Sequence, residues 1–379
     1  METREALVSN GSAERPVLYM AMELSLMKWV LRFSPATTKH RDVTVDAGDI
    51  ERLCSEIEKA KRAFSLAESA AVKSCFEAGR DGFWIHRFLA SKGVENVVVD
   101  AASIEMPRRN RRAKTDGIDV EKLLRLLIQY GNGEKDVWSV VRVPSEEDED
   151  RRHASRELYR LKKEKTQHTN RIKGLLMSQG IRVKSVAKLP ETLDLAHLWD
   201  DGPLRNNLRA EVLREFDRFR LLNKQICELE AERSKRLKKP TNETDMKAAH
   251  LTKLRGVGEV SADTLSKEVF GWRQFRNRRE LPALVGLAPS PYSSGEMQRD
   301  QGISKAGRGE LRALLVELAW SWVRYQPDSK LTLWFNDRFG GAGKRSRRVG
   351  IVGVARKLLI ALWRYVEQGV IPEGAVVEA

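Results

Sequence analysis

The sequence predicts three successive parts: an α/β domain, a long helical segment and a mainly helical C-terminal domain. Three observations lead to this fold class. Short β-branched runs alternate with helical patterns as far as residue 130. Two long, heavily charged helical patterns follow, as far as residue 240. Glycine turns then separate shorter amphipathic segments. A chain of 379 residues is long enough for about two or three domains.

The first domain is expected over residues 16–144, after a disordered tail at residues 1–15. Its predicted elements are strands at 17–23, 26–33 and 42–46, a helix capped by Asp49, a strand at 71–77, a helix at 83–91, a strand at 94–100 and a helix at 119–130. Residues 137–141 suit one added strand. Three antiparallel strands followed by helix, strand, helix, strand and helix is the order of an RNase H-like fold. Such sheets hold ligands at their strand ends.

Four carboxylates fall where this arrangement would bring them together. Glu23 ends the first strand and Glu77 ends the fourth. Asp116 and Asp119 lie three apart on one face of the last helix. Such a cluster would repel itself unless metal ions offset the charge, and Mg²⁺ or Mn²⁺ suits oxygen ligands. A pair of these ions can stabilise the attacking and leaving oxygens of a phosphoryl transfer. The alternative is that Asp116 caps the helix and Glu23 lies at a solvated strand end.

A run of cations directly precedes the last two acids in sequence. Its members are Arg108, Arg109, Arg111, Arg112 and Lys114. They would attract a phosphate backbone to the metal site, although a solvated basic loop is the simpler alternative. The whole chain carries a net charge of +15, which indicates a polyanionic partner, most simply nucleic acid.

Composition argues against several other classes of protein. No run of eighteen apolar residues is present, so no membrane span is expected. Cys54, Cys75 and Cys227 are far apart and show no metal or disulfide spacing. This favours a reducing cytoplasm and no structural zinc. The sequence also has no glycine-rich phosphate loop of the Walker type, so it does not indicate an ATP-driven enzyme.

The middle segment is expected over residues 145–240 as two long helices. The first begins at Ser145 with an acidic first turn and extends to about residue 179, and the second covers about residues 208–238. This pattern predicts a coiled coil, either antiparallel within one subunit or formed between subunits. The apolar residues at heptad spacing in the second helix are Val212, Phe219, Leu222, Ile226 and Leu229.

The C-terminal domain is expected over residues 241–370, followed by a tail at 371–379. Gly256 and Gly258 lie between short helices, in a turn that looks like a helix-hairpin-helix. Its N–H groups can hold a DNA phosphate. Residues 337–350 are rich in glycine and cations and predict a flexible phosphate-binding loop, with a solvated loop as the alternative. An amphipathic helix at 352–366 closes the domain. The loop's cations are Arg338, Lys344, Arg345, Arg347 and Arg348.

Residues 286–295 contain two prolines, three serines and two glycines, and predict an irregular loop. A helix begins near Gly309, so the loop would present hydroxyl groups from a packed base. Lys305, in the Ser-Lys-Ala-Gly motif between loop and helix, is a candidate nucleic-acid contact. The alternative is a surface turn whose serines only cap. The predicted buried face of the helix is Leu311, Leu314, Leu315, Leu318, Ala319 and Trp322.

Two groups of motifs resemble a known family. Glu77 and the phrase Lys114-Thr115-Asp116-Gly117-Ile118-Asp119 resemble the RuvC-like domain of the DEDD transposases, which belong to insertion-sequence family one hundred and ten. The motifs at residues 254–258, 284–289, 292–295 and 302–312 are similar in order and spacing to the transposase domain of that family. The resemblance covers roughly residues 17 to 370.

The resemblance implies an RNA-guided, site-specific DNA recombinase. A structured RNA from the element, the bridge RNA, is expected to pair with donor and target DNA. The four acids of one subunit would bind Mg²⁺ beside the catalytic serine of another, in a holoenzyme of two dimers. Ser294 matches the nucleophile of the family, with Ser293 as its adjacent competitor, and its attack would give a covalent phosphoserine intermediate. The implied location is the cytoplasm of a bacterium or archaeon, at the nucleoid.

One position departs from the family pattern. The first acid is an aspartate in the family and Glu23 here, and Ala21 stands where the family has glycine. Glutamate reaches about 1.5 Å further, whereas Mg²⁺ demands near-ideal octahedral geometry. Either the site tolerates Glu23 or this copy is inactive. Because the rest of the reading frame is intact, we expect an active enzyme.

The chemistry also leaves other classes open. A serine hydroxyl is a weak nucleophile at neutral pH, and the serine loop contains no histidine, so metal ions would have to activate it. One alternative is a RuvC-like hydrolytic nuclease or junction resolvase whose C-terminal domain only binds DNA. The other is a decayed copy that binds nucleic acid without cutting it.

Overall fold

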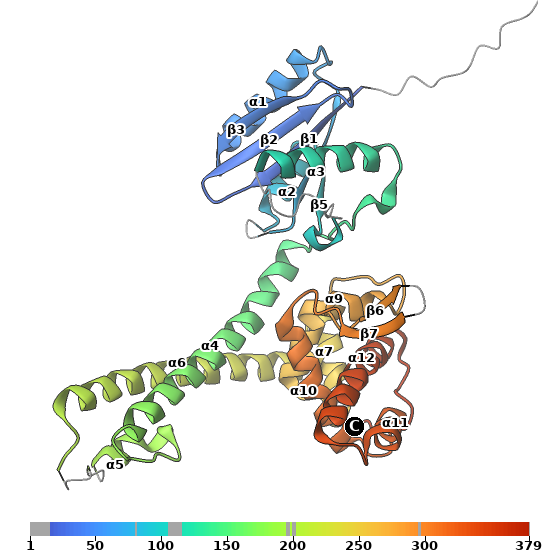
Figure 1. Cartoon of the computed structure of the whole chain (residues 1–379). Coiled ribbons are helices and arrows are strands. Elements are labelled where there is room, and N and C mark those ends of the chain that lie inside the picture. The colour runs from blue at the N-terminus through green and yellow to red at the C-terminus, as the bar shows by residue number, and fades with distance from the viewer. Residues whose placement is uncertain are drawn as a thin grey trace, which may run out of the picture. The chain divides into compact units, whose positions relative to one another are not determined.

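The computed structural model describes residues 16–79, 82–104, 116–194, 198, 202–294 and 297–378, with the backbone alone at residues 102, 116–118, 291–294 and 297–301. The chain divides into two compact units, Met1–Val143 and Pro144–Ala379. Figure 1 labels the elements of each unit. In the parts of the chain that are described, no helix is long and apolar enough to span a membrane.

The first unit is built on a five-stranded sheet in the order β3-β2-β1-β4-β5. β1 pairs antiparallel with β2, and β2 pairs antiparallel with β3. β1 pairs parallel with β4, and β4 pairs parallel with β5. The predicted succession of strands and helices is therefore confirmed. The strands are β1 (Val17–Leu24), β2 (Lys28–Ser34), β3 (Arg41–Asp46), β4 (Ala71–Glu77) and β5 (Glu95–Val99).

Both faces of this sheet are covered by helices. α1 (Ile50–Ala63) and α2 (Trp84–Ser91) pack on the core that contains Leu18, Met20 and Met22. α3 (Asp116–Gly131) packs on the opposite face, against Tyr19 and Ala21. Side chains alternate across a strand, so even and odd positions of β1 face different helices.

Two details of this unit differ from the sequence prediction. β2 begins at Lys28 because Ser25 closes a tight turn, in which the Ser25 hydroxyl donates to the Lys28 carbonyl at 2.5 Å and accepts from the Lys28 N–H at 3.2 Å. The added strand predicted at 137–141 is reduced to a 3₁₀ turn (Lys135–Val137) and one isolated bridge between Val99 and Val140. The Asp49 cap is confirmed, since its carboxylate accepts from the Arg52 N–H at 2.9 Å.

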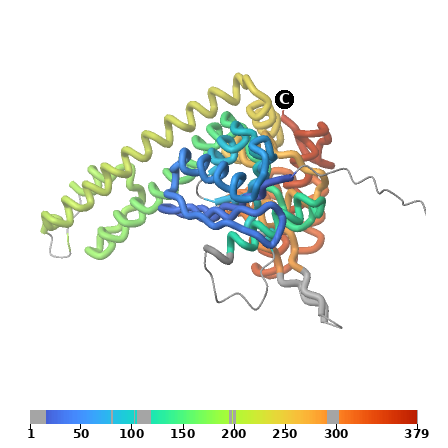
Figure 2. Tube along the Cα trace, turned by 90° about the horizontal axis from the view of Figure 1, so that it is seen from above, coloured from blue at the N-terminus to red at the C-terminus, as the bar shows by residue number. Residues whose placement is uncertain are grey.

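The second unit begins with a helical hairpin. α4 (Glu146–Met177) and α6 (Asn206–Lys238) are joined by a 3₁₀ turn (Val186–Lys188) and α5 (Leu189–Asp194), and both long helices extend away from the C-terminal bundle (Figure 2). Ser145 caps α4 by accepting from the Asp148 N–H at 3.0 Å. Of the two arrangements left open by the heptad pattern, the structure shows pairing within one chain. The two packed clusters contain Leu158, Leu161, Leu222 and Ile226, and Ile172, Leu176, Val212 and Phe216.

The C-terminal bundle surrounds one apolar core, which includes Leu315, Trp322, Leu358 and Leu359. Residues 266–270 continue α8 as a π-helical turn, a form often found at functional sites. The elements are α7 (Glu243–Thr252), α8 (Glu259–Leu265), α9 (Glu280–Leu284), β6 (Pro289–Ser294), β7 (Met297–Ile303), α10 (Gly309–Tyr325), α11 (Lys330–Phe339) and α12 (Lys344–Gln368).

Two predictions about this bundle are wrong. The serine segment is a strand, β6, which pairs with β7 as a two-stranded hairpin. Proline is tolerated there because the hairpin has no central strand, and the register shifts between Pro289 and Pro291. The cation-rich segment 337–350 is mostly helical, since α11 ends at Phe339 and α12 begins at Lys344. By contrast, the predicted buried face of α10 is confirmed at Leu311, Leu315, Leu318, Ala319 and Trp322.

Candidate functional site

The base of the β6–β7 hairpin is held by two glycines in the left-handed region. Gly286 has φ +70° and Gly307 has φ +74°. A Cβ on Gly286 would overlap the Ala306 carbonyl oxygen, and a Cβ on Gly307 would overlap that of Leu284. Only glycine allows both this φ and this close approach of backbone to backbone. We name residues 284–288 and 304–307 the hairpin base.

Hydrogen bonds join the two chain segments of the hairpin base. The Ser304 N–H donates to the Ala288 carbonyl at 2.8 Å, and the Lys305 N–H donates to the Gly286 carbonyl at 3.1 Å. Arg312 of α10 donates to the Val285 carbonyl at 3.2 Å. The strand that carries the candidate serines therefore starts from a backbone position that is fixed on both sides.

A buried carboxylate connects the hairpin base with α4. Glu268, in the π-helical turn, is 4% exposed and pairs with Arg308, the residue after the hairpin base, at 2.6 Å. Its two oxygens also accept from Arg156 of α4, at 2.7 and 3.0 Å. Burial opposes ionisation of Glu268, but hydrogen bonds from Arg156 and Arg308 outweigh it and hold its pKa below the ordinary value. Nearby, burial and the charge of Arg152 lower the pKa of Arg273 to about 10.

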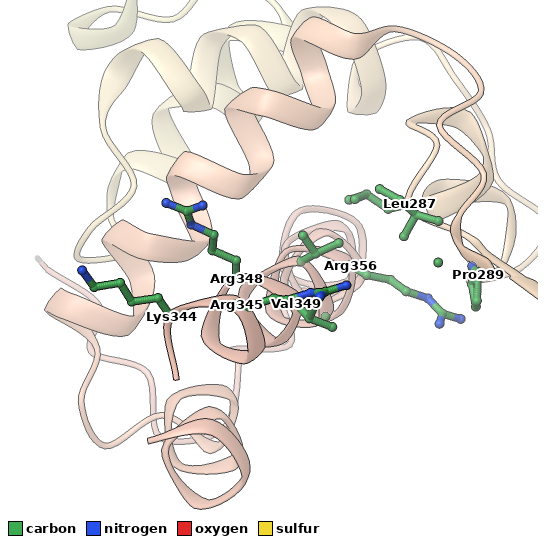
Figure 3. A pocket seen from close by; sticks show the side chains of 11 residues that line it. Leu287, Pro289, Lys344, Arg345, Arg348, Val349 and Arg356 are labelled. Carbon is green, nitrogen blue, oxygen red and sulfur yellow. The ribbon is translucent and has the colours of Figure 1, made fainter. Parts of the chain in front are cut away.

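A cavity of about 730 Å³ lies between the hairpin base and the first turns of α12 (Figure 3). Apolar side chains form part of its wall, and among the side chains that the structure describes, all the charged ones that line it are cations. Lys344, Arg345 and Arg348, predicted as nucleic-acid contacts, are among them, while Arg347 is not. The lining residues are Leu287, Pro289, Gly302, Ile303, Lys344, Arg345, Arg348, Val349, Val352, Gly353 and Arg356.

The candidate nucleophiles lie at the far end of β6 from the hairpin base. Ser293 pairs with Gln298, and Ser294, the last residue of β6, pairs with Met297. Their side chains belong to the segment that is described by its backbone alone. Lys305 lies in the hairpin base with φ +56°, a value uncommon for a residue with a side chain.

The predicted acids lie in the first unit, on the α3 side of the sheet. Met22 and Phe76 are partners in the parallel register, so Glu23 and Glu77 follow at the same carboxyl edge of adjacent strands. Alternation places both on the face of Ala21 and Cys75, which packs on α3. Burial first, and then the charge of Glu77, raise the pKa of the Cys75 thiol, which agrees with this placement.

The last two predicted acids lie in the first turn of α3. Asp119 is partly buried there, while the Asp116 side chain lies outside the described residues. So do Arg108, Arg109, Arg111, Arg112 and Lys114. Among the side chains that are described, no three histidine, cysteine or acidic groups come close enough to hold a metal ion. The two strand-end carboxylates are nevertheless the kind of oxygen donor that Mg²⁺ prefers.

The glycine turn that resembles a helix-hairpin-helix has a clear packing role. Gly256 has φ +86°, and a Cβ there would lie 3.2 Å from the Tyr325 Cβ of α10. Ser321 donates to the Gly256 carbonyl at 2.7 Å. Gly258 is the N-cap of α8 and has open space around it. Residues 371–379, predicted to be a tail, also contact this turn, because Leu254 forms a β-bridge with Val377.

Sequence reasoning missed two sets of residues. The contacts of Glu268 with Arg156 and Arg308 join positions 112 and 40 apart in the chain, so no local spacing could reveal them. Arg356 lines the cavity but follows the segment that looked like a basic loop. Arg356 lies eight residues after Arg348, a spacing that would place both on one face of a helix. The glycines that precede α12 suggested a loop instead, so this spacing was not recognised.

Comparisons with known proteins agree on one family. The profile described as "Transposase IS116/IS110/IS902 family" matches residues 248–333, which include the hairpin and its base. A putative transposase, y4rJ, of Sinorhizobium fredii is 42% identical over 378 residues, which cover 95% of this chain and 94% of that protein. The transposase for insertion sequence element IS1328 of Yersinia enterocolitica is 27% identical over 215 residues, covering 56% of this chain and 61% of that protein.

Proposed function

Because the chain belongs to the IS116/IS110/IS902 family of transposases, we propose that it cuts and rejoins DNA through a covalent link to Ser294. The observation that carries this proposal is the hairpin base. It fixes the start of the strand that bears Ser293 and Ser294, beside a cavity whose described charged side chains are all cations. A nucleophile on a fixed strand next to a phosphate-attracting surface is the arrangement that a phosphoryl transfer needs.

The proposed reaction has two steps. In the first, a bond forms between Ser294 Oγ and the phosphorus of the scissile phosphodiester as the bond to one flanking nucleotide breaks. Ser294 loses its proton, and the released nucleotide end gains one and becomes a hydroxyl. In the second, a hydroxyl from the partner strand attacks the same phosphorus, and Ser294 regains its proton. The covalent link conserves the energy of the phosphodiester, so the exchange needs no ATP.

The first unit would supply the acids of this reaction. The observed strand order, with three antiparallel strands followed by two parallel ones, supports an RNase H-like, RuvC-like fold for it. Glu23, Glu77, Asp116 and Asp119 would hold Mg²⁺ or Mn²⁺. Such an ion, when bound, lowers the pKa of a hydroxyl and offsets negative charge at phosphorus.

The partners of the enzyme are also part of the proposal. The resemblance to the family supports a structured guide RNA that pairs with donor and target DNA, and a dimeric or tetrameric assembly. The net charge of +15 supports a polyanionic partner of either kind. Within such an assembly, the acids of one subunit would act beside Ser294 of another.

The test is a search for a covalent protein–DNA adduct on a denaturing gel. Purified protein is mixed with RNA from the flanking element, labelled donor and target DNA, and Mg²⁺. The expected result is an adduct that Ser294→Ala abolishes and Ser293→Ala retains. Cleavage without any adduct would instead support a hydrolytic nuclease. Binding without cleavage in Mg²⁺ would support a decayed copy.

A further inference from the structure

The cavity beside the hairpin base has two kinds of lining. Its apolar lining includes Leu287 of the hairpin base, Ile303 of β7, and Val349 and Val352 of α12. Its volume of about 730 Å³ lies within the range of sites that hold small organic ligands. Val349 is 64% exposed although it lies among cations, so a sizeable apolar surface is open to solvent there. A phosphate alone would gain nothing from this apolar surface.

The charged lining is unbalanced. Lys344, Arg345, Arg348 and Arg356 all line the cavity, and none of the carboxylates whose side chains the structure describes does. None of the four forms an ion pair with any residue that the structure describes, whereas the nearby Arg308 pairs with both Glu268 and Glu310. Like charges held together without a counter-ion repel one another, and an anion placed between them would remove this repulsion.

The cavity lies at the opposite end of β6 from the proposed nucleophile, a short distance away. Pro289, which lines it, and Ser294 are the first and last residues of β6. A strand of this length places them at most about 17 Å apart. Since successive nucleotides of one duplex strand rise about 3.4 Å, the cavity lies within about five nucleotides of a phosphate at Ser294.

We propose that this cavity receives one nucleotide that is turned out of the DNA strand near the scissile phosphate. Its base lies against the apolar wall formed by Leu287, Ile303 and Val349, and its phosphate lies among the cations. Enzymes that act on a base extrude it from the duplex and hold it in a pocket between aromatic or apolar side chains, and this cavity offers a similar apolar surface. The inference rests on the proposed function, because it takes the strand at Ser294 to be the one that supplies the nucleotide.

The test is a fluorescence scan with 2-aminopurine, a base analogue that brightens when it leaves the stack. The analogue is placed in turn at each of about ten positions around the cleavage site, five on each side. Each duplex is bound to the native protein with its guide RNA, and full binding is verified by anisotropy. Two variants are compared: Val349→Glu, which puts a negative charge in the cavity, and Leu333→Glu. Leu333 is 56% exposed on α11 and does not line the cavity, so this control has the same change in charge.

The expected result is a rise in fluorescence at one or two adjacent positions, lost in Val349→Glu and kept in Leu333→Glu. Arg356→Gln should reduce the slope of log affinity against log salt by about one, whereas Arg364→Gln, exposed on the same helix, should not. Absence of any rise, or an equal rise in Val349→Glu, overturns the proposal. A second scan places the analogue in the guide RNA. If fluorescence rises only in the RNA, and Val349→Glu abolishes that rise, the cavity binds RNA and the proposal is overturned.

The same samples separate the two proposals. The yield of covalent protein–DNA adduct is measured in each sample on a denaturing gel. Adduct without any rise in fluorescence leaves the serine chemistry standing and removes the nucleotide site. A position-specific rise without adduct supports the nucleotide site and contradicts the serine chemistry.

Discussion

The guanidinium of Arg156 in α4 forms two hydrogen bonds, of 2.7 and 3.0 Å, with the carboxylate of Glu268, 112 residues later in the chain. The same carboxylate pairs with Arg308, which directly follows the hairpin base. One buried acid therefore joins the long helical hairpin to the segment that carries the candidate serines. A shift of α4 along its axis would have to break these contacts or move the hairpin base with it.

We predict that Glu268→Gln lowers the free energy of unfolding of the second unit by about 3–5 kcal/mol, because it leaves cations in a buried site without their counter-charge. Thermal melting followed by circular dichroism measures this. The control is Glu310→Gln, which removes the half-exposed partner of Arg308 and should cost at most about 1 kcal/mol. Equal melting temperatures for native protein and Glu268→Gln would contradict the role given to this carboxylate.

The contribution of Glu268 to the free energy of unfolding should decrease as the pH falls. The pKa of Glu268 is held below its ordinary value of 4.5, so the pairing is fully present above about pH 4.5 and is lost as pH falls through the folded-state pKa. The difference in stability between native protein and Glu268→Gln should therefore shrink below pH 4.5. Melting curves at a series of pH values from 7 downward measure it. A difference that grows on acidification would show that the carboxylate is not stabilised as an anion.

We predict that Gly307→Ala disrupts the hairpin base, because its Cβ would overlap the Leu284 carbonyl in addition to straining a φ of +74°. Gly180→Ala is the matched control, since Gly180 has φ +80° and open space around it. The control should cost only the left-handed strain, about 1–2 kcal/mol. Gly307→Ala should cost clearly more and should also lose adduct formation with DNA. Similar melting temperatures and adduct yields for the two variants would show that the close approach is unimportant.

The pairing of α4 with α6 within one chain can be tested by a zero-length crosslink. Lys162 Nζ and Glu230 Oε1 are 2.6 Å apart, so a carbodiimide should join them as an amide. We mix protein grown on ¹⁴N and on ¹⁵N, crosslink it and analyse the peptides by mass spectrometry. The expected Lys162–Glu230 peptide carries one isotope throughout and is absent from Glu230→Gln. Crosslinked peptides with mixed isotopes would mean that the helices pair between subunits.

We predict that Glu77→Gln reduces Mg²⁺-dependent strand cleavage at least about a hundredfold, the usual loss when one charge-stabilising group is removed from a phosphoryl-transfer site. A chelator should have the same effect on the native protein, and added Mn²⁺ should restore cleavage. Glu95→Gln, at a carboxylate that is 69% exposed at the start of β5, is the control. Cleavage that persists in Glu77→Gln or in chelator would remove the acids from the mechanism.

The elements that follow a simple period were predictable from sequence. Strand β4 lies at the predicted residues 71–77, and the helix near Gly309 buries the expected face. In both, one repeating pattern of apolar side chains decides the local structure and the face that is buried. The five-stranded sheet followed from the succession of such elements.

The elements that depend on distant contacts were not predictable in this way. The two prolines of β6 argued against a strand, yet a two-stranded hairpin held at a glycine base tolerates them. The glycines at 340, 341 and 343 suggested a flexible loop, although only this short break separates α11 from α12. The Glu268 contacts combine three segments far apart in sequence, so they become visible only when the chain is folded.

The most direct test of covalent catalysis by Ser294 is to identify the residue that becomes linked to DNA. The adduct formed with RNA, DNA and Mg²⁺ is digested with protease and nuclease, and the phosphonucleotide-bearing peptide is sequenced by mass spectrometry. We predict a modification on Ser294, and none on the corresponding peptide from Ser294→Ala. A modification on Ser293 or on any other residue, or a strand cut without a modified peptide, would contradict it.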